Sequence, residues 1–292
     1  AGSPAAISIV RYLKSKGYYV VGIDANSDTY DIGEWSCDEF YLSPLATAKD
    51  YIPFIIEKLT RCDVFLPFID EELRAISESN ISVDILTKVM ISSAETIRLC
   101  TDKIKFQTFC EKTDLSIAPR TDCIPAVYKP QFGRGGKGVA IIDDDEFLSL
   151  YRKKKGVIQT YLSGKEYTVD CYFDDNSKLL QAVSRQRVLA TGVSTIGIID
   201  LNKEVLNLVE KVANNIDFTG LVNMQVMLTN GGPYLIEINP RLSGSLIFTI
   251  LSGADFLSAY INSKVYATEY LNFEVSAKKI TRYWSEYETS NG

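Results

Sequence analysis

The apolar positions in the first third of the chain alternate between a helical and a strand-like spacing. A helix is predicted near the start by apolar residues at the i, i+3, i+4 and i+7 positions of one face, which are Ala6, Ile9, Val10 and Leu13. A continuous apolar run over 18–24 predicts a buried parallel strand, and the pattern repeats as a helix over 49–60 and a strand over 64–69. Helices and strands in alternation predict an α/β domain, with ligands near the carboxyl ends of its strands.

A doubly wound domain of this kind normally has a strand before its first helix, but this sequence opens on a tight turn at 1–4. We therefore expect the first strand to be missing from these residues, and whether the native protein contains it stays open. The run 18–24 ends in Asp24, interpreted as a turn residue because no GxGxxG loop precedes it. The acidic cluster 70–72 after the strand 64–69 is interpreted as a helix N-terminus, where carboxylates favour the helix dipole.

The pattern changes around 92–101, and we place the boundary of the first domain there. Thr101 is the expected N-cap of a helix over 102–113. Lys103 lies in the first turn of that helix, where a cation is electrostatically disfavoured unless it serves an anion. A solvated surface lysine is the alternative interpretation.

A glycine-rich segment, QFGRGGKG over 131–138, lies between short predicted strands at 126–130 and 139–142. Its glycines allow backbone N–H groups to approach phosphates closely, and they are Gly133, Gly135, Gly136 and Gly138. The segment is not a Walker A loop, because no GK[ST] ends it, and a β-branched strand rather than a helix follows. Positive charge is concentrated there by Lys129, Arg134 and Lys137. A plain hairpin turn is the alternative, but so many glycines favour a phosphate-binding flap.

The strand 157–162 and the alternating strand 166–173 flank a hinge at 163–164. The second strand has one apolar face, made by Tyr167, Val169, Cys171 and Phe173. Its opposite face is made by Glu166, Thr168, Asp170 and Tyr172. An adenine lying against the first strand would bring its ribose within reach of Glu166. The segment by itself is an ordinary half-buried strand.

A further strand over 178–184 is followed by Arg185, Arg187 and a predicted loop over 190–197. Two arginines beside a loop of small residues suit an anionic substrate and, equally, a surface ion-pair cluster. Helices are predicted over 203–216 and 255–262.

The segment 221–245 predicts a hairpin with strands over 222–228 and 234–239. If the hairpin is symmetric about Gly231, Gln225 lies opposite Glu237 and Asn223 lies opposite Asn239. Side chains alternate along a strand, so Glu237 and Asn239 share a face. Carboxylate and amide oxygens together are ligands that Mg²⁺ accepts, and Arg241 supplies a permanent charge for a transferring phosphoryl group. A polar hairpin ending in Pro-Arg is the alternative.

The amino-acid composition limits the kinds of catalytic site that this chain can contain. The 292 residues contain no histidine, so a Cys–His nucleophile is excluded and zinc is disfavoured. The six cysteines form no CxxC pair and suit buried positions in a reducing compartment. A formal net charge of −6 argues against a nucleic-acid binder, and we expect neither a membrane span nor a signal peptide. Chemistry driven by metal and phosphate charge needs no histidine.

These motifs, in this order, resemble the ATP-grasp superfamily, and in particular the ATP-binding half of the carbamoyl-phosphate synthase large chain. The motifs are TDK at 101–103, YKP at 128–130, GRGGKG at 133–138, QTYLSGKEYTVD at 159–170 and Gln225 with Glu237-x-Asn239-Pro240-Arg241. The resemblance implies an α/β fold that becomes α+β in its C-terminal part. It implies a Rossmann-like pre-ATP-grasp domain at 1–95, a connecting helical region at 96–125, a small lobe at 126–165 and a large lobe at 166–292.

The resemblance also implies roles for single residues. ATP would be bound by Lys103, Lys129, Gly133, Gly135, Gly136, Gly138, Gln159, Tyr161, Leu162 and Glu166. One or two Mg²⁺ ions, with Mn²⁺ as a substitute, would be bound by Gln225, Glu237 and Asn239. Phosphoryl transfer would be assisted by Arg241, Arg185 and Arg187.

The implied activity is an ADP-forming carboxylate–amine ligase of the cytoplasm, acting on small molecules and not on nucleic acids or membranes. The alternatives are activation of bicarbonate or another small acid, and a sensor that binds Mg-ATP without turnover. A nicotinamide oxidoreductase is disfavoured because no phosphate fingerprint is present. The chain is too short for a complete synthase large chain, so carbamoyl phosphate formation is in doubt. The substrates and the oligomeric state stay open, with a homodimer as one alternative.

Overall fold

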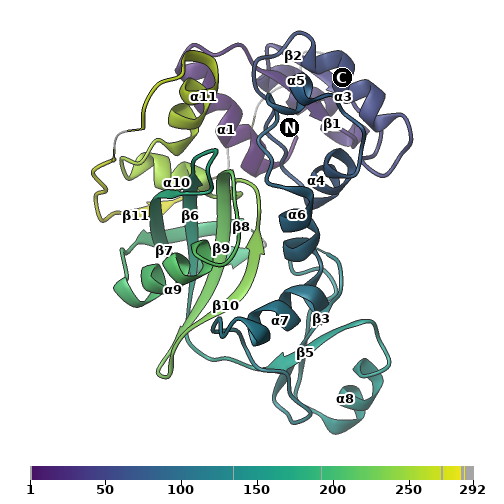
Figure 1. Cartoon of the computed structure of the whole chain (residues 1–292), viewed down its shortest axis with the longest axis vertical. Coiled ribbons are helices and arrows are strands. Elements are labelled where there is room, and N and C mark those ends of the chain that lie inside the picture. The colour runs from purple at the N-terminus through teal and green to yellow at the C-terminus, as the bar shows by residue number, and fades with distance from the viewer. Residues whose placement is uncertain (1, 134, 192, 271, 284–285, 287–292) are drawn as a thin grey trace.

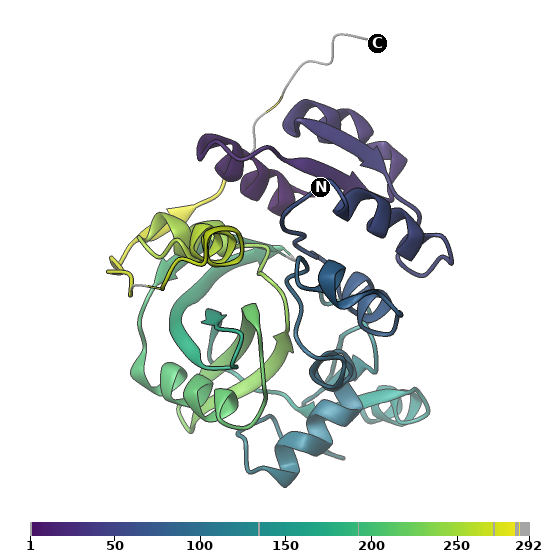
Figure 2. The same ribbon diagram turned by 45° about the horizontal axis from the view of Figure 1, so that its top comes forward.

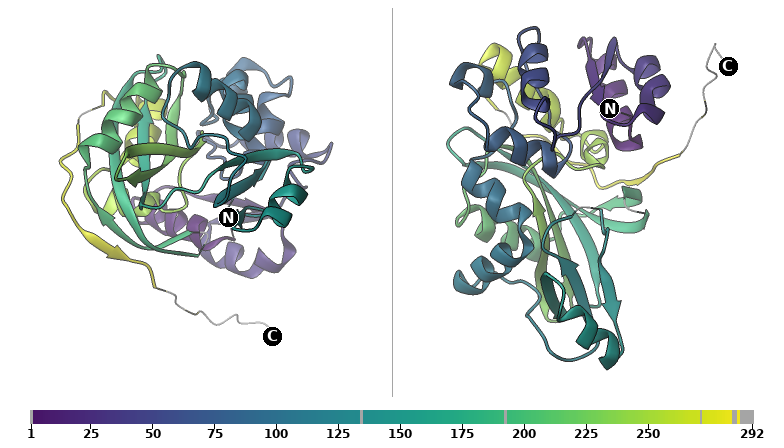
Figure 3. Two further views of the ribbon diagram at one scale, coloured as in Figure 1. Left: turned by 90° about the horizontal axis from the view of Figure 1, so that it is seen from below. Right: turned by 90° about the vertical axis from the view of Figure 1, so that its right-hand side faces the viewer.

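The structure is a computed structural model that describes residues 2–133, 135–191, 193–270, 272–283 and 286. It is a mixed α/β protein with sheets of two, three and six strands. Figure 1 shows the N-terminal elements above the six-stranded sheet, with the three-stranded sheet at the lower right. In Figure 3 (right) the N-terminal elements lie at one end of the molecule and the three-stranded sheet at the other. No helix in these described ranges has the length and apolarity needed to cross a membrane.

The N-terminal part has a short parallel sheet in which β1 pairs with β2. Its elements are α1 (Pro4–Ser15), β1 (Val21–Asp24), a 3₁₀ turn (Ser27–Thr29), α2 (Tyr30–Ser36), β2 (Glu39–Leu42), α3 (Tyr51–Leu59) and α4 (Asp70–Ser77). The predicted strand 64–69 is not a named strand, and among the described residues its only bridge is an isolated parallel one between Phe65 and Val89. The predicted strand is therefore wrong: the segment forms no ladder in the described residues, and Pro67 is its one buried residue. An apolar run does not specify a ladder partner.

Three helices connect this part to the rest of the chain, namely α5 (Val83–Leu86), α6 (Ala94–Thr101) and α7 (Lys103–Lys112). The expected N-cap of the third helix is corrected by one residue. Asp102, not Thr101, caps α7, because its Oδ1 accepts hydrogen bonds from the backbone N–H groups of Ile104 (3.0 Å) and Lys105 (3.1 Å). Lys103 is thereby confirmed in the first turn.

The three-stranded sheet has the order β4-β3-β5 and is antiparallel throughout. Its strands are β3 (Ala126–Pro130), β4 (Ala140–Ile142) and β5 (Gly156–Thr160), with α8 (Asp145–Tyr151) between the last two. The flap 131–138 is the connection from β3 to β4, as the glycine pattern predicted.

The six-stranded sheet has the order β10-β9-β6-β7-β8-β11. Its strands are β6 (Lys165–Phe173), β7 (Leu179–Thr191), β8 (Val193–Ile199), β9 (Gly220–Thr229), β10 (Gly232–Asn239) and β11 (Lys279–Thr281). The predicted loop 190–197 is wrong, because its described residues, 190–191 and 193–197, belong to β7 and β8, which pair with each other. Small residues alone do not distinguish a loop from a strand, because the pairing with a neighbouring strand determines the conformation of such a segment.

The curved sheet is covered on both faces (Figure 2). On one face, α9 (Lys203–Ala213) packs through Val205 and Val209 against the side of β6 that carries Tyr167 and Val169. On the other face, Tyr172 packs with residues of α1, α10 (Leu246–Leu251) and α11 (Phe256–Tyr266). The predicted alternation along β6 is confirmed, and the second face is buried as well.

Candidate active site

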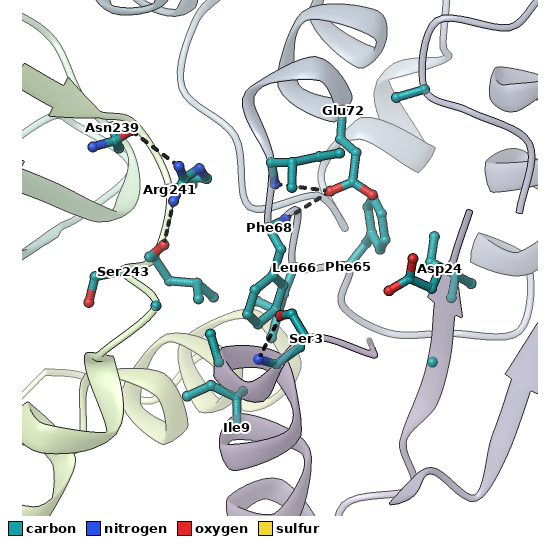
Figure 4. A pocket seen from close by; sticks show the side chains of 18 of the residues that line it. Ser3, Ile9, Asp24, Phe65, Leu66, Phe68, Glu72, Asn239, Arg241 and Ser243 are labelled. Atoms are coloured by element: carbon teal, nitrogen blue, oxygen red, sulfur yellow. Dashed lines mark hydrogen bonds between the residues drawn. The ribbon is translucent and has the colours of Figure 1, made fainter. Parts of the chain in front are cut away.

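A cavity of about 1460 Å³ lies between the N-terminal elements, the flap and the end of the six-stranded sheet. Figure 4 shows Asn239, Arg241 and Ser243 on one side of it, facing Phe68, Glu72 and α1. Its polar wall includes most of the site residues expected from the sequence, which are Lys103, Lys129, Gly133, Gly135, Gly136, Glu166, Arg187, Gln225, Glu237, Asn239 and Arg241.

The hairpin β9–β10 brings Gln225 opposite Glu237 and Asn223 opposite Asn239, as predicted. It is not symmetric about Gly231, because the ladder begins with Gly232 opposite Thr229 and shifts between Leu235 and Glu237. Such a shift is a β-bulge, which inserts one unpaired residue and bends the strand. Here that residue is Ile236, and its carbonyl accepts a hydrogen bond from Lys129 Nζ at 3.0 Å. This hydrogen bond at the bulge links the three-stranded sheet, through Lys129 of β3, to strand β10 of the hairpin.

The oxygen-rich face of this hairpin has one carboxylate and three amides. Asn239 Nδ2 donates to Glu237 Oε1 at 3.1 Å, which holds the two side chains together. Asn223 is 5% exposed and lines the cavity, and its Oδ1 is buried with no hydrogen-bond partner in the described structure. A buried acceptor without a donor is costly unless a ligand satisfies it. The set fits a hard cation such as Mg²⁺, although no group of three His, Cys, Asp or Glu suited to a metal occurs within the described ranges.

Arg241 is held by three acceptors at the cavity wall. Its Nε donates to Asp70 Oδ1 at 2.8 Å, its Nη2 to Asn239 Oδ1 at 3.2 Å and its Nη1 to the Leu242 carbonyl at 3.2 Å. Asp70 was interpreted from the sequence only as part of a helix N-terminus. It is the first residue of α4, as expected, but it also binds the arginine, and no local pattern signals a partner so distant along the chain.

Two lysines and the flap form the roof of the cavity. Lys103 Nζ donates to the carbonyl of Gly133 at 2.7 Å. Burial lowers the pKa of Lys129 to about 8, because desolvation penalises the ammonium form, while the charge of Glu237 opposes that shift. Gly135 and Gly136 have φ of +63° and +74°, and open space surrounds the position of a Cβ at each. Glycine is therefore required there by backbone conformation and not by close approach. Arg134 lies outside the described residues.

The two arginines of β7 have different environments. Arg187 lines the cavity and forms an ion pair with Glu166 across the sheet. Arg185 is 0% exposed and is surrounded by Asp170, Thr249, Ser243 and Ser245. The structure does not bring Arg185 to the cavity, because the chain after β10 and helix α10 cover it.

Four of the residues expected to bind ATP do not line the large cavity, although one of them, Gln159, lines a smaller pocket together with Lys103 and Lys129. Gln159 is buried, and its Nε2 donates to Gln107 Oε1 at 2.5 Å and to the Ala118 carbonyl at 3.3 Å. The Tyr161 N–H donates to the Pro125 carbonyl at 3.1 Å. Gln159, Tyr161, Leu162 and Gly138 are absent from the described residues that line the large cavity.

Comparison with known proteins shows which proteins the chain resembles in sequence and in fold. Residues 152–282 match the model of a family described as ATP-grasp in the biosynthetic pathway with Ter operon. The chain is 27% identical over 271 residues to the carbamoyl phosphate synthase large chain of Clostridium botulinum (strain Alaska E43 / Type E3), an alignment covering 82% of this chain and 25% of the relative. The chain thus spans about a quarter of the length of the curated relatives it matches.

Solved structures with this fold include two enzymes of low sequence identity. N5-carboxyaminoimidazole synthetase from Staphylococcus aureus matches with a TM-score of 0.69 at 17% identity, covering 94% of this chain and 78% of that one. The biotin carboxylase domain of Hydrogenobacter thermophilus 2-oxoglutarate carboxylase, solved with MgADP, ADP and bicarbonate, matches with a TM-score of 0.71 at 17% identity. That alignment covers 93% of this chain and 69% of the other.

Proposed function

We propose that the chain is an ATP-dependent ligase that activates a carboxylate and couples it to an amine, because residues 152–282 match an ATP-grasp family model and the fold is similar to that of a solved N5-carboxyaminoimidazole synthetase. The observation that carries this proposal is the convergence of Lys103, Lys129, Glu237, Asn239 and Arg241 on one cavity. Phosphoryl transfer requires cationic side chains, oxygen ligands for a metal ion and a guanidinium held in place, and this cavity contains candidates for all three. Positioning and electrostatic stabilisation supply the rate enhancement, so a chain without histidine suffices.

Lys103 and Lys129 would bind the ATP phosphates, and both now donate to backbone carbonyls that phosphate oxygens would replace. The flap would cover the phosphates with its N–H groups. Glu166 would bind the ribose hydroxyls after exchanging its contact with Arg187, which then becomes available to an anionic substrate. The backbone of Tyr161 and Leu162, directly after β5, is our candidate for binding adenine.

Glu237, Asn239 and Gln225, with the orphaned oxygen of Asn223, would bind one or two Mg²⁺ ions, with Mn²⁺ as a substitute. When bound, the metal neutralises phosphate charge. In the reaction, a carboxylate oxygen of the substrate attacks the γ-phosphorus, and the bond to the β–γ bridging oxygen breaks to release ADP. An amine then attacks the acyl carbon and phosphate leaves, while the amine loses a proton. Arg241 would stabilise the charge that develops on the transferring phosphoryl group.

The N-terminal part supports our proposal of a Rossmann-like domain at 1–95. The edge of β1 that does not pair with β2 and the segment 64–69 both line the cavity, together with apolar residues of α1 and α3. Strands with helices on both faces are typical of a doubly wound sheet, and we propose that a further strand belongs between these two segments. The remaining proposed units are the connecting region 96–125, the small lobe 126–165 and the large lobe 166–292.

All six cysteines are free thiols in the structure, which supports our proposal of a reducing compartment such as the cytoplasm. We propose small-molecule substrates, and a homodimer remains one candidate assembly. Bicarbonate is the second candidate acid, because the relatives include a carbamoyl phosphate synthase and a carboxylase solved with bicarbonate.

The proposed chemistry is tested by trapping the acyl phosphate. Hydroxylamine reacts with such mixed anhydrides to form hydroxamates. The protein is incubated with Mg-ATP, hydroxylamine and each acid of a panel that contains amino acids, small organic acids and bicarbonate, and we expect ADP to form with the true substrate. For the true organic acid a hydroxamate should accumulate, and a carboxyl-¹⁸O label should appear in the phosphate. Release of AMP and pyrophosphate would refute the mechanism. Binding of Mg-ATP without ADP from any acid would favour a sensor.

The lowered pKa of Lys129 predicts that Mg-ATP affinity falls as the pH rises through about 8. Above that pH, Lys129 is neutral in the free protein. Bound phosphate stabilises the ammonium form of Lys129, so the binding of Mg-ATP is accompanied by uptake of a proton by this side chain. The affinity should therefore decrease by up to about tenfold per pH unit between 8 and 9.5. Calorimetric titration measures this slope. Lys129→Arg keeps its charge and should give a flatter profile; equal slopes in both proteins would contradict the assignment.

A further inference from the structure

The hydrogen bonds of Arg241 determine which N–H groups of its guanidinium could still donate to a ligand. An arginine has five N–H groups, and three of them are used by Asp70, Asn239 and the Leu242 carbonyl. One N–H on each terminal nitrogen has no acceptor among the residues that the structure describes, and the side chain lines the cavity. Two donors on a planar group match two oxygens of a phosphoryl group only when the plane has a fixed orientation. The orientation of Arg241 therefore matters as much as its charge.

Asp70 is the one charged group among these acceptors. It lies 171 positions away in sequence, at the start of α4 in the N-terminal part, whereas Asn239 and Leu242 are neighbours of Arg241 along the chain. Both side chains of the Arg241–Asp70 pair are largely shielded, with 12% and 16% exposed. A shielded, charge-assisted bond to Nε restricts rotation of the guanidinium more strongly than the two neutral acceptors do.

Helix α4 also contacts the flap 131–138. Arg74, one turn after Asp70, places its guanidinium carbon 5.0 Å from the centre of the Phe132 ring, which precedes the flap glycines. One helix thus touches both the flap and the arginine proposed to stabilise phosphoryl transfer.

We propose that Asp70 is a positioning residue for Arg241, through which the N-terminal part sets the geometry of phosphoryl transfer. This inference rests on the proposed function. Asp70 does not touch the reacting atoms; it fixes the plane of the guanidinium through Nε and leaves both terminal nitrogens able to donate. An ion pair that only joins two parts of the fold would affect stability and not the rate of transfer.

The test is Asp70→Asn, which keeps the size of the side chain and removes its charge. The rate of ADP formation at saturating substrates should fall about 10- to 100-fold, whereas the dissociation constant of Mg-ATP should change less than about threefold. Asp70→Glu should recover part of the rate. Glu95→Gln is the matched control, because Glu95 is an exposed carboxylate in the first turn of α6, a helix of eight residues like α4.

A double-mutant cycle with Arg241→Lys separates positioning from general stability. In the lysine background, Asp70→Asn should cost little further rate, because the planar group to be oriented is gone. Additive losses, or equal losses of rate and Mg-ATP affinity, would overturn the proposal.

A readout independent of turnover keeps this inference distinct from the proposed function. In protein with ¹⁵N-labelled arginine, the Nε–H signal of Arg241, assigned by its loss in Arg241→Lys, should exchange slowly with water. It should lose that protection in Asp70→Asn and keep it in Glu95→Gln. Unchanged protection in Asp70→Asn overturns the positioning role. Lost protection together with a wild-type protein that forms no ADP would refute the ligase assignment and leave the orientation of Arg241 by Asp70 intact.

Discussion

Glu237→Gln is expected to lower the rate of ADP formation by about a thousandfold or more without unfolding the protein. Glu237 is the single carboxylate of the oxygen-rich face of the β9–β10 hairpin, so its replacement leaves only neutral amides to hold a divalent cation. The structural cost should be small, because a glutamine Oε1 can still accept the hydrogen bond that Asn239 Nδ2 now donates.

The measurement is ADP release with the active acid in Mg²⁺, paired with thermal melting. Glu204→Gln, an exposed glutamate in the first turn of α9, is the control for loss of one negative charge and should retain full activity. A Glu237→Gln protein with normal melting and near-normal turnover would show that the metal is bound elsewhere.

Arg185→Met is expected to lower the free energy of unfolding by about 3–5 kcal/mol, because it leaves the Asp170 carboxylate buried without its partner. Arg185 also donates to Thr249 Oγ1 at 2.8 Å and to the hydroxyls of Ser243 and Ser245 at 2.9 and 2.7 Å. These acceptors lie in α10 and in the chain before it, so the arginine joins β7 to the segment that covers it. Denaturant unfolding measures the loss.

Two further variants separate burial from catalysis. Adding Asp170→Asn to Arg185→Met removes the uncompensated charge and should restore part of the lost stability. Arg187→Met breaks a more exposed pair with Glu166 and should cost much less. If Arg185→Met melted normally but lost turnover, the role in phosphoryl transfer suggested by the sequence would be correct.

The sequence by itself determined the features that depend on local periodicity and backbone conformation. The i, i+3, i+4, i+7 pattern located α1 and α9, and the alternation of β6 placed Tyr167 and Tyr172 on opposite faces of the sheet. The glycines of 133–138 marked the flap, because positive φ is a property of single residues. The pairing of Gln225 with Glu237 also followed from the hairpin, since both strands lie close together in the chain.

Only the tertiary structure decided which of these side chains reach the cavity. Arg185 and Arg187 are two residues apart on the same face of β7, yet α10 buries the first and leaves the second at the cavity wall. The bulge at Ile236 and the partner of Arg241 depend on segments distant in sequence, β3 and α4, that contribute a lysine and an aspartate. Local propensity carries no information about such contacts, because they form only when separate parts of the chain pack together.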